Sequence, residues 1–268
     1  MSDSQASLPH PPPTPPLNPT KFSNRVAIIT GAASGIGRET AIFFARQDAQ
    51  VIFFDVNESG LLETHHLITT SGGKAAFRQC DITKEEEVNA SIAWVMRDFG
   101  KVDILINLAG IYEFQPLTSC PTELFTRHME INVHGAFYLT RAVLPHMQNN
   151  KYGRIVHTSS TTYSDPKPGL SAYVTSKAAV LGLVRSAAVE AGPGVTVNAV
   201  MPGLIETERM KSVDMFHAIQ GIVLGNQAVK RQGTPMDVAN VIGFVAGEEA
   251  GFMSGQVFNV SGGEVFSW

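Results

Sequence analysis

The sequence predicts the α/β class, with a doubly wound parallel sheet of seven strands, helices on both faces and a single domain. Three observations predict it. Short apolar runs alternate with amphipathic segments from Arg25 to the end of the chain. The apolar runs are nearly continuous, without the polar alternation of a half-exposed strand. A glycine-rich stretch, Gly31 to Gly37, joins the first apolar run to the first amphipathic segment.

The seven expected strands are the apolar runs themselves. Near-continuous hydrophobicity suits strands that are covered on both faces, as parallel strands are. The expected strands span residues 25–30, 50–55, 74–79, 102–107, 153–158, 195–200 and 256–260.

Helical patterns occupy the intervals between these strands. Right-handed crossovers through such helices give three layers and a Rossmann-type topology. No internal repeat or second change in composition divides the chain, so we expect one domain over 21–268. The expected helices span residues 36–47, 58–70, 84–98, 122–149, 172–190 and 235–248.

Two segments fall outside this alternation. Seven prolines between Pro9 and Pro19 predict a disordered, proline-rich tail over 1–20. The stretch 206–231 is longer than an ordinary connection, rich in apolar residues, and leaves the carboxyl end of a strand, where doubly wound sheets bind ligands. We interpret it as a substrate lid; a packed pair of surface helices is the alternative.

Composition excludes several functional classes. The net charge of −4, with acidic and basic residues interspersed, gives no footprint for nucleic acid or a membrane surface. No apolar run reaches the roughly 18 residues that span a bilayer, and the first residues lack the apolar core of a secretory signal. Cys80 and Cys120 show no metal-ligand spacing. We therefore expect reduced thiols, no metal site and a cytoplasmic protein.

The glycine-rich turn predicts a dinucleotide site. Gly31, Gly35 and Gly37 follow the first strand directly and open the first helix, with the spacing G-x-x-x-G-x-G. Glycines there allow a tight turn and let backbone N–H groups, including those of Ser34 and Ile36, approach a pyrophosphate. A plain strand-to-helix turn is the alternative interpretation.

Asp55, at the tip of the second strand, favours NAD as the cofactor. Its carboxylate can accept hydrogen bonds from the adenosine ribose hydroxyls and would repel the 2′-phosphate of NADP. Ser34 and Val56 supply no nearby cation for that phosphate. After the third strand, Asp81 and Ile82 are expected to cover the adenine; a cap for the next helix is the alternative role of Asp81.

Tyr173 and Lys177 are four residues apart on an expected helix, so their side chains share a face. A free tyrosine has a pKa near 10, too high for a base at neutral pH. A lysine ammonium one turn away, together with a positive nicotinamide, would lower this pKa. The strand before this helix ends at Ser159 and Ser160, at the edge where a parallel sheet presents groups to its ligand.

These motifs resemble those of the short-chain dehydrogenase/reductase family over about residues 22–268. The similar segments are Thr30–Gly37 (TGxxxGxG), Asn107–Gly110 (NNAG), Asn132 in INVHG, Tyr173–Lys177 (YxxxK), Pro202–Thr207 (PGxxxT) and 254–263 (TGQxxxVDGG). The chain departs from the family at Leu108, where asparagine is usual, and at Ser261, where aspartate is usual.

The resemblance implies the roles of the site residues. The family's serine lies thirteen residues before the tyrosine, which selects Ser160 and leaves Ser159 a structural role. Tyr173 is then the general acid and base, and Ser160 hydrogen-bonds the substrate oxygen. Lys177 binds the cofactor ribose and lowers the pKa of Tyr173, while Asn132 holds a water of the proton relay. The further cofactor-binding residues that it implies are Asn107, Ala109, Gly110, Pro202, Gly203, Leu204, Ile205 and Thr207.

The expected substrate is a hydrophobic, aromatic or cyclic secondary alcohol or its ketone, because the residues around the site are largely apolar and aromatic. AGIY (109–112) and TSSTTY (158–163) are similar to segments of aryl-alkyl secondary alcohol dehydrogenases. Core or subunit packing of these aromatics is the alternative. The residues expected to line the substrate site are Tyr112, Thr162, Tyr163, Leu170, Leu204, Met210 and Phe216.

Other activities are weighed against this one. Reduction of 3-oxoacyl groups on a carrier protein normally uses NADPH and a basic docking patch, which Asp55 and the acidic net charge oppose. Reduction of a steroid or polyketide ketone remains open. A catalytically silent NAD-binding regulator should lack one of the four catalytic residues, and all four are present. The resemblance also implies a homotetramer, or a dimer, that pairs the long helices and the last strand.

Overall fold

The structure is a computed structural model that describes residues 18–212 and 216–266, with 216–218 described by their backbone alone. Its centre is one sheet of seven parallel strands in the order β3-β2-β1-β4-β5-β6-β7. The strands are β1 (Val26–Thr30), β2 (Gln50–Asp55), β3 (Lys74–Gln79), β4 (Ile104–Asn107), β5 (Gly153–Thr158), β6 (Val195–Pro202) and β7 (Val257–Val260).

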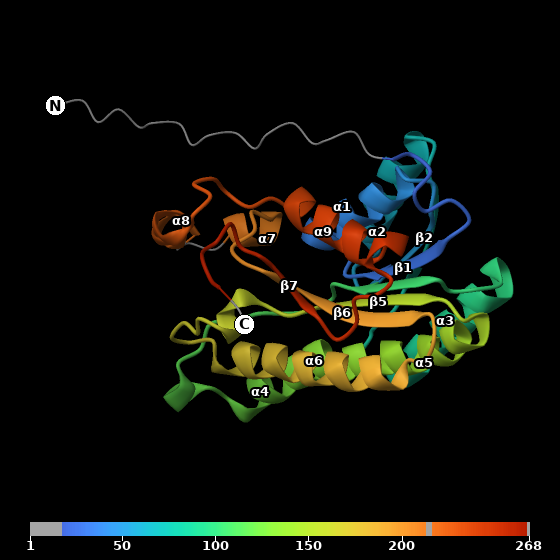
Figure 1. Ribbon diagram of the computed structural model, residues 1–268. Helices are drawn as coiled ribbons and strands as arrows, with labels where there is room; N and C mark the ends of the chain where they lie inside the picture. Colours follow the sequence, from blue (N-terminus) through green and yellow to red (C-terminus); the bar gives the residue numbers. More distant parts are fainter. Residues whose placement is uncertain (1–17, 213–215, 267–268) are drawn as a thin grey trace.

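Helices cover both faces of this sheet, as Figure 1 shows. Helices α1, α2 and α9 pack on one face around one apolar cluster, and α3, α5 and α6 pack on the other around a second. The helices are α1 (Gly35–Ala45), α2 (Glu58–Thr70), α3 (Glu85–Phe99), α4 (Thr122–Met129), α5 (Gly135–Asn150), α6 (Ser171–Glu190), α7 (Glu208–Lys211), α8 (Phe216–Asn226) and α9 (Pro235–Val245).

The predicted fold class and all seven predicted strands are confirmed, with strand ends that move by one or two residues. The central strands are buried along their whole length, as continuous apolar runs predict. The helix expected over 122–149 is interrupted by one π-helical turn, Glu130–His134, between α4 and α5. Such a turn inserts an extra residue into the helix, which the apolar pattern alone does not show.

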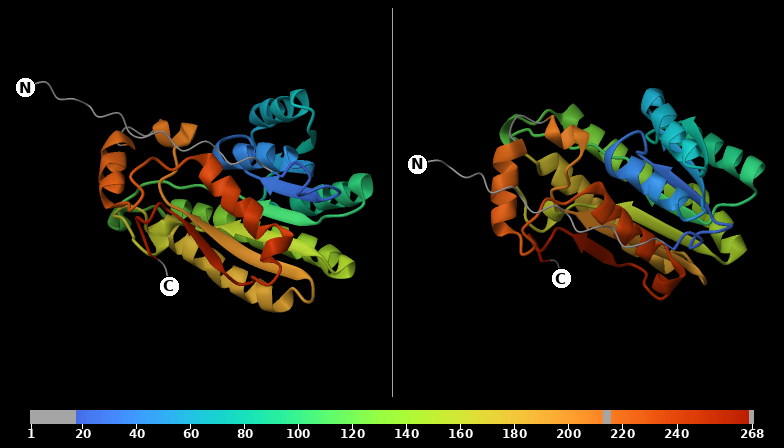
Figure 2. Two further views of the ribbon diagram at one scale, coloured as in Figure 1. Left: turned by 45° about the horizontal axis from the view of Figure 1, so that its top comes forward. Right: turned by 90° about the horizontal axis from the view of Figure 1, so that it is seen from above.

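The segment predicted as a lid, 206–231, forms the two helices α7 and α8. Both helices lie together at one end of the molecule in the two views of Figure 2. α7 follows the carboxyl end of β6 within a few residues. The predicted tail over 1–20 lies outside the described residues except for 18–20, which begin a turn. No helix in the described part of the chain is long and apolar enough to cross a membrane.

A chain of buried polar side chains joins three central strands to α5. The Thr30 hydroxyl donates to Asn107 Oδ1 at 2.6 Å, and Asn107 Nδ2 lies 3.4 Å from His157 Nδ1. His157 Nε2 lies 2.8 Å from the Thr140 hydroxyl, which donates to the Ala136 carbonyl. Since that hydroxyl has one proton, His157 donates through Nε2 and accepts through Nδ1. The network therefore fits only a neutral imidazole.

We predict that His157 makes the protein sensitive to acid. Burial, reinforced by the charge of Lys177, lowers the His157 pKa from 6.5 to about 4. Below pH ~6.5 the unfolded chain binds a proton at this histidine that the folded protein refuses, so stability falls as the pH falls towards 4. Between pH ~7 and pH ~5 this loss amounts to roughly 2 kcal/mol. Denaturant unfolding at both pH values measures it.

His157→Asn should reduce this loss, whatever its effect on stability at neutral pH. His66→Asn is the matched control, because His66 is exposed on α2. An acid-induced loss as large in His157→Asn as in the wild type would contradict the prediction.

Candidate active site

The four catalytic candidates meet at the carboxyl end of the sheet. β5 ends at Thr158, two residues before Ser160, and α6 begins two residues before Tyr173. The segments that leave β4, β5 and β6 all run to the end of the sheet where α7 and α8 lie (Figure 2). The parallel topology thus brings together residues that are far apart in sequence.

Lys177 is a buried ammonium one turn beyond Tyr173. Its Nζ donates to the Thr158 carbonyl at 2.8 Å and lies 5.8 Å from the centre of the Tyr173 ring. Only 5% of Lys177 is exposed, and this burial lowers its pKa from 10.5 to about 8. An ammonium has three donors. One is therefore committed to β5, and the other two have no hydrogen-bond partner among the residues that the structure describes.

The two adjacent serines have different partners. Ser159 donates its hydroxyl to the Lys177 carbonyl at 2.9 Å and joins α6 to β5. The Ser160 oxygen accepts from the Thr162 N–H at 3.3 Å and from the Thr162 hydroxyl at 3.0 Å. Its own proton is left free, and its side chain faces Tyr173 closely enough to lower the pKa of that phenol. This geometry agrees with the selection of Ser160.

The pKa of Tyr173 is raised above its ordinary value of 10, because burial of the phenol outweighs the effects of its neighbours. Ser160 and Arg209 lower this pKa, and the phenol of Tyr112 raises it further. Lys177 is not among the groups that shift this pKa here, since its Nζ donates to the Thr158 carbonyl. The lowering expected from Lys177 together with a bound positive nicotinamide stays a prediction.

Asn132 lies in the π-helical turn between α4 and α5. Its Oδ1 accepts from the Ile111 N–H at 2.9 Å, and its Nδ2 donates to the Ile111 carbonyl at 3.0 Å and to the Ser176 hydroxyl at 2.9 Å. A Cβ on Gly110 would come within 2.9 Å of Asn132 Oδ1 and 3.3 Å of Lys177 Nζ. The absence of a side chain at Gly110 therefore lets the segment after β4 lie close to both residues.

The turn after β1 has the shape of a phosphate cradle. Gly31 and Gly35 have φ values of +70° and +55°, and a Cβ on Gly37 would meet the Gly31 carbonyl oxygen at 2.0 Å. Ser34 precedes α1 without capping it through its side chain, which leaves the N–H groups of the first turn for a ligand. These features fit the pyrophosphate of a dinucleotide.

Asp55 lies against this turn from the end of β2. Its carboxylate accepts from the Ala33 N–H at 3.1 Å and from the Asn57 N–H at 3.0 Å. Ala33 belongs to the turn itself, so the carboxylate stands beside the cradle, as ribose recognition requires. Two predicted groups of the site are thus neighbours in the structure.

Thr207 brings the segment after β6 to the same turn. A Cβ on Gly35 would lie 3.2 Å from the Thr207 methyl group. Its hydroxyl accepts from the Met210 N–H and caps α7. Pro202, at the end of β6, accepts from the Thr161 hydroxyl. Gly203 is packed so closely on Ser261 that a Cβ would meet that side chain at 2.9 Å.

Other residues of the predicted cofactor set have side chains that pack or bond elsewhere. Ile82 and Ile205 are each 5% exposed, lie in the two apolar clusters, and can offer a ligand only backbone groups. The Asp81 carboxylate accepts from the Thr83 N–H and hydroxyl, so it stabilises the turn before α3. The buried Asn107 belongs to the polar network described above, and the Ala109 N–H donates to Thr30.

Some of the predicted substrate residues meet near Tyr173. The Tyr112 ring centre lies 6.1 Å from that of Tyr173, and its hydroxyl contacts the Met210 sulfur. Thr162 is bound to Ser160. Tyr163 is 46% exposed on the 3-10 turn Thr161–Tyr163.

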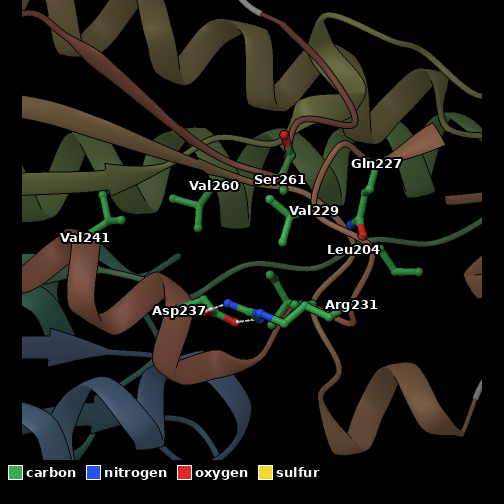
Figure 3. A pocket seen from close by; sticks show the side chains of 11 residues that line it. Leu204, Gln227, Val229, Arg231, Asp237, Val241, Val260 and Ser261 are labelled. Carbon is green, nitrogen blue, oxygen red and sulfur yellow. Dashed lines mark hydrogen bonds and ion pairs between the residues drawn. The ribbon is translucent and has the colours of Figure 1, made fainter. Parts of the chain in front are cut away.

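The other three predicted substrate residues have no side-chain hydrogen bond with the catalytic candidates in the described part of the chain. Leu170 is 5% exposed at the start of α6. Leu204 lines a pocket of about 260 Å³ with Gln227 and Ser261, and none of the four catalytic candidates lines that pocket (Figure 3). The Phe216 side chain lies outside the described residues.

Two residues near Tyr173 were missing from the predicted site. The buried His128 has its ring centre 6.4 Å from that of Tyr173, and its Nδ1 lies 2.9 Å from the Leu124 carbonyl. Its spacing of four residues from Asn132 is a helical signal that points to the site. Arg209 reaches the site because α7 folds over Tyr112. No sequence pattern links Arg209 to Tyr112.

The chain is similar in sequence and in fold to several known proteins. A family model described as enoyl-(acyl carrier protein) reductase matches residues 31–264. The 7alpha-hydroxysteroid dehydrogenase of Escherichia coli K12 is 37% identical over 246 residues, which are 91% of this chain and 96% of that protein. The (2S)-[(R)-hydroxy(phenyl)methyl]succinyl-CoA dehydrogenase subunit BbsD of Thauera aromatica is 36% identical over 243 residues, 90% and 97% of the two chains. The crystal structure of gox2181 superposes with a TM-score of 0.87 and 30% identity, covering 92% of this chain and 98% of that one.

Proposed function

This chain belongs to the short-chain dehydrogenase/reductase family, and on that premise we propose that it is an NAD-dependent oxidoreductase that interconverts a hydrophobic secondary alcohol and its ketone. Action on hydroxyl or keto groups with a nicotinamide cofactor follows from the family. NAD, the hydrophobic substrate and the oligomeric state are our proposals. The observation that carries the proposed chemistry is the meeting of Ser160, Tyr173 and Lys177 at the end of β5.

Tyr173 handles the proton in the proposed mechanism. Its hydroxyl accepts the proton of the alcohol in oxidation and donates a proton to the substrate oxygen in reduction. Ser160 has an uncommitted hydroxyl proton beside Tyr173, which it donates to the same oxygen as negative charge develops there. The nicotinamide, when bound, accepts or supplies the hydride.

In the proposed mechanism Lys177 and Asn132 assist Tyr173 without contacting the reacting carbon. The two free N–H groups of Lys177 are the donors for ribose hydroxyls, and its charge favours the ionised phenol once such hydroxyls draw it towards Tyr173. The Asn132 side chain is engaged with Ile111 and Ser176, so we assign it a positioning role. The relay water is proposed to lie at the π-helical turn that carries Asn132, since such turns are frequent at functional sites.

Asp55 supports NAD over NADP. Its carboxylate already accepts from the Ala33 N–H beside the pyrophosphate cradle. A 2′-phosphate placed there would meet a negative charge at short range, and like charges in contact cost several kcal/mol.

Tyr112 and Met210 support a hydrophobic substrate. The Tyr112 ring lies beside that of Tyr173, and the Tyr112 hydroxyl contacts the Met210 sulfur. The two relatives described above act, by their names, on a hydroxysteroid and on a hydroxy(phenyl)methyl compound. A cyclic or aromatic group flanking the reacting carbon fits both the aromatic surroundings and these relatives.

We predict that Tyr173→Phe lowers turnover about a thousandfold, the range expected when a general acid/base is removed. NAD affinity should remain nearly unchanged, because the ring and Lys177 are kept. Initial rates with a panel of secondary alcohols, followed by NADH formation, measure turnover, and fluorescence titration measures NAD binding. Tyr138→Phe on α5 is the matched control. Substantial turnover by Tyr173→Phe would sink the assignment.

A second prediction concerns the choice of cofactor. The wild type should use NAD at least about a hundredfold more efficiently than NADP in kcat/KM, since several kcal/mol oppose the phosphate. Asp55→Ser should narrow this ratio, chiefly by lowering the KM for NADP. Asp98→Ser, at an exposed acid on α3, is the control. A wild-type preference for NADP would refute the proposal.

Exposed apolar side chains support an oligomer, a homotetramer or a dimer. Phe125 and Phe137 are 39% and 42% exposed on α4 and α5. Phe244 and Phe252 are 40% and fully exposed near β7, which pairs with β6 alone in the described sheet. Contiguous apolar surface and an unpaired strand edge are typical of contacts between subunits.

We predict that Phe137→Glu shifts the assembly to a smaller species in sedimentation velocity, because it buries a charge in the proposed contact. Leu62→Glu alters a side chain that is 53% exposed on α2, outside that contact, and should leave the size unchanged. A monomeric wild type would disprove the proposed oligomer.

A further inference from the structure

We infer that Arg209 selects substrates that carry a carboxylate at the end remote from the reacting carbon. This inference rests on the proposed function and narrows its substrate class from hydrophobic alcohols and ketones to hydrophobic ones with an anionic tail. Arg209 lies on α7, two residues after Thr207, so a single short segment would contact both the cofactor and the substrate.

Contacts with Tyr112 hold the Arg209 side chain in place. Its guanidinium carbon lies 5.0 Å from the centre of the Tyr112 ring, and its Nη2 lies 3.3 Å from the Tyr112 carbonyl oxygen, to which it donates. Both contacts are with Tyr112, one with its ring and the other with its backbone carbonyl. The guanidinium is therefore directed at the segment after β4 rather than free in solution, although Arg209 itself is exposed.

The guanidinium lies within reach of a substrate bound at Tyr173. The centres of the Tyr112 and Tyr173 rings are 6.1 Å apart. Together with the 5.0 Å contact, this distance sets an upper limit of about 11 Å between the guanidinium carbon and the Tyr173 ring centre. The Arg209 charge also acts on Tyr173, since it lowers the pKa of that phenol. One small molecule can thus span both groups.

Arg209 differs from the other basic residues around this end of the sheet. Lys211 pairs with Glu206 at 2.6 Å, Arg127 pairs with Glu113 at 3.3 Å, and Lys167 pairs with Asp165. Arg209 has no carboxylate within 4.0 Å among the residues that the structure describes.

The donor set of Arg209 fits a carboxylate. A guanidinium has five N–H donors, and within the described part of the chain only one is committed, to the Tyr112 carbonyl. The remaining donors form the planar fork that binds a carboxylate through two parallel hydrogen bonds. The two contacts with Tyr112 restrain the guanidinium, which reduces the entropy lost on binding. A purely structural role, in which Arg209 only holds α7 against Tyr112, is the competing explanation.

Matched ketones that differ only in charge separate these explanations. The first pair is 4-acetylbenzoate and 4-acetylbenzamide, and the second is 4-oxocyclohexanecarboxylate and its amide. In NADH-linked reduction by the wild type we expect kcat/KM to be about tenfold or more higher for the carboxylate of a pair, mainly through a lower KM, because hydrogen bonds to charged groups are the stronger ones.

Arg209→Gln should bring the carboxylate-to-amide ratio close to one, and Arg209→Lys should keep part of it, because lysine retains the charge without the fork. Arg127→Gln is the matched control: it removes a guanidinium nearby that is already paired with Glu113, and should leave the ratio unchanged.

The outcomes separate failure of the inference from failure of the proposed function. Equal use of both members of a pair by the wild type overturns the role of Arg209 alone. A parallel fall for both members in Arg209→Gln, with their ratio kept, also overturns it, since that is the signature of a structural role. Reduction of no ketone by the wild type, whether charged or neutral, overturns the proposed function and this inference with it.

Discussion

A buried ammonium group organises the catalytic end of the sheet. Lys177 is 5% exposed and has one hydrogen bond, to the Thr158 carbonyl at the end of β5. Burying a charge with so few partners has a desolvation penalty, and this penalty is what lowers the pKa of Lys177. The structure around it has to accept the charge without neutralising it, because the described residues place no carboxylate within ion-pair distance of its Nζ. Ser159 fixes the lysine's own backbone. Gly110 has no side chain to crowd the Lys177 ammonium group. The pKa of His157 is lowered by burial and by the charge of Lys177, so this histidine stays neutral.

The sequence predicted the elements of this arrangement better than their electrostatics. Helical spacing was enough to place Tyr173 and Lys177 on one face, and the buried parallel strands follow from their apolar runs. The direction of the Tyr173 pKa could not be predicted in this way, because it depends on how deeply the phenol is buried and on where the lysine head points. Both are properties of the packed structure.

The direction of side chains explains where the structure differs from the predicted cofactor-binding set. Ile82 and Ile205 belong to the predicted cofactor-binding set, and in the structure their side chains lie in the two apolar clusters. A motif fixes the position of a residue along the chain but not which way a loop residue faces. The π-helical turn at Asn132 and the contact of Arg209 with Tyr112 arise from segments far apart in sequence, so a single sequence shows neither.

The two positively charged residues near Tyr173 differ in burial, because Lys177 is buried and Arg209 is exposed. Lys177 and Arg209 approach Tyr173 from different elements, α6 and α7. The buried Lys177 can contact only groups that reach the interior, and its charge is weakly screened there, which suits the role in proton chemistry proposed for it. The exposed Arg209 is hydrated when no ligand is bound, so its charge has only a small desolvation cost. This suits the inferred contact with a ligand that arrives from solvent. The two positions are not interchangeable, because an ammonium on α7 would be a point charge without the planar fork of donors that binds a carboxylate through two parallel hydrogen bonds.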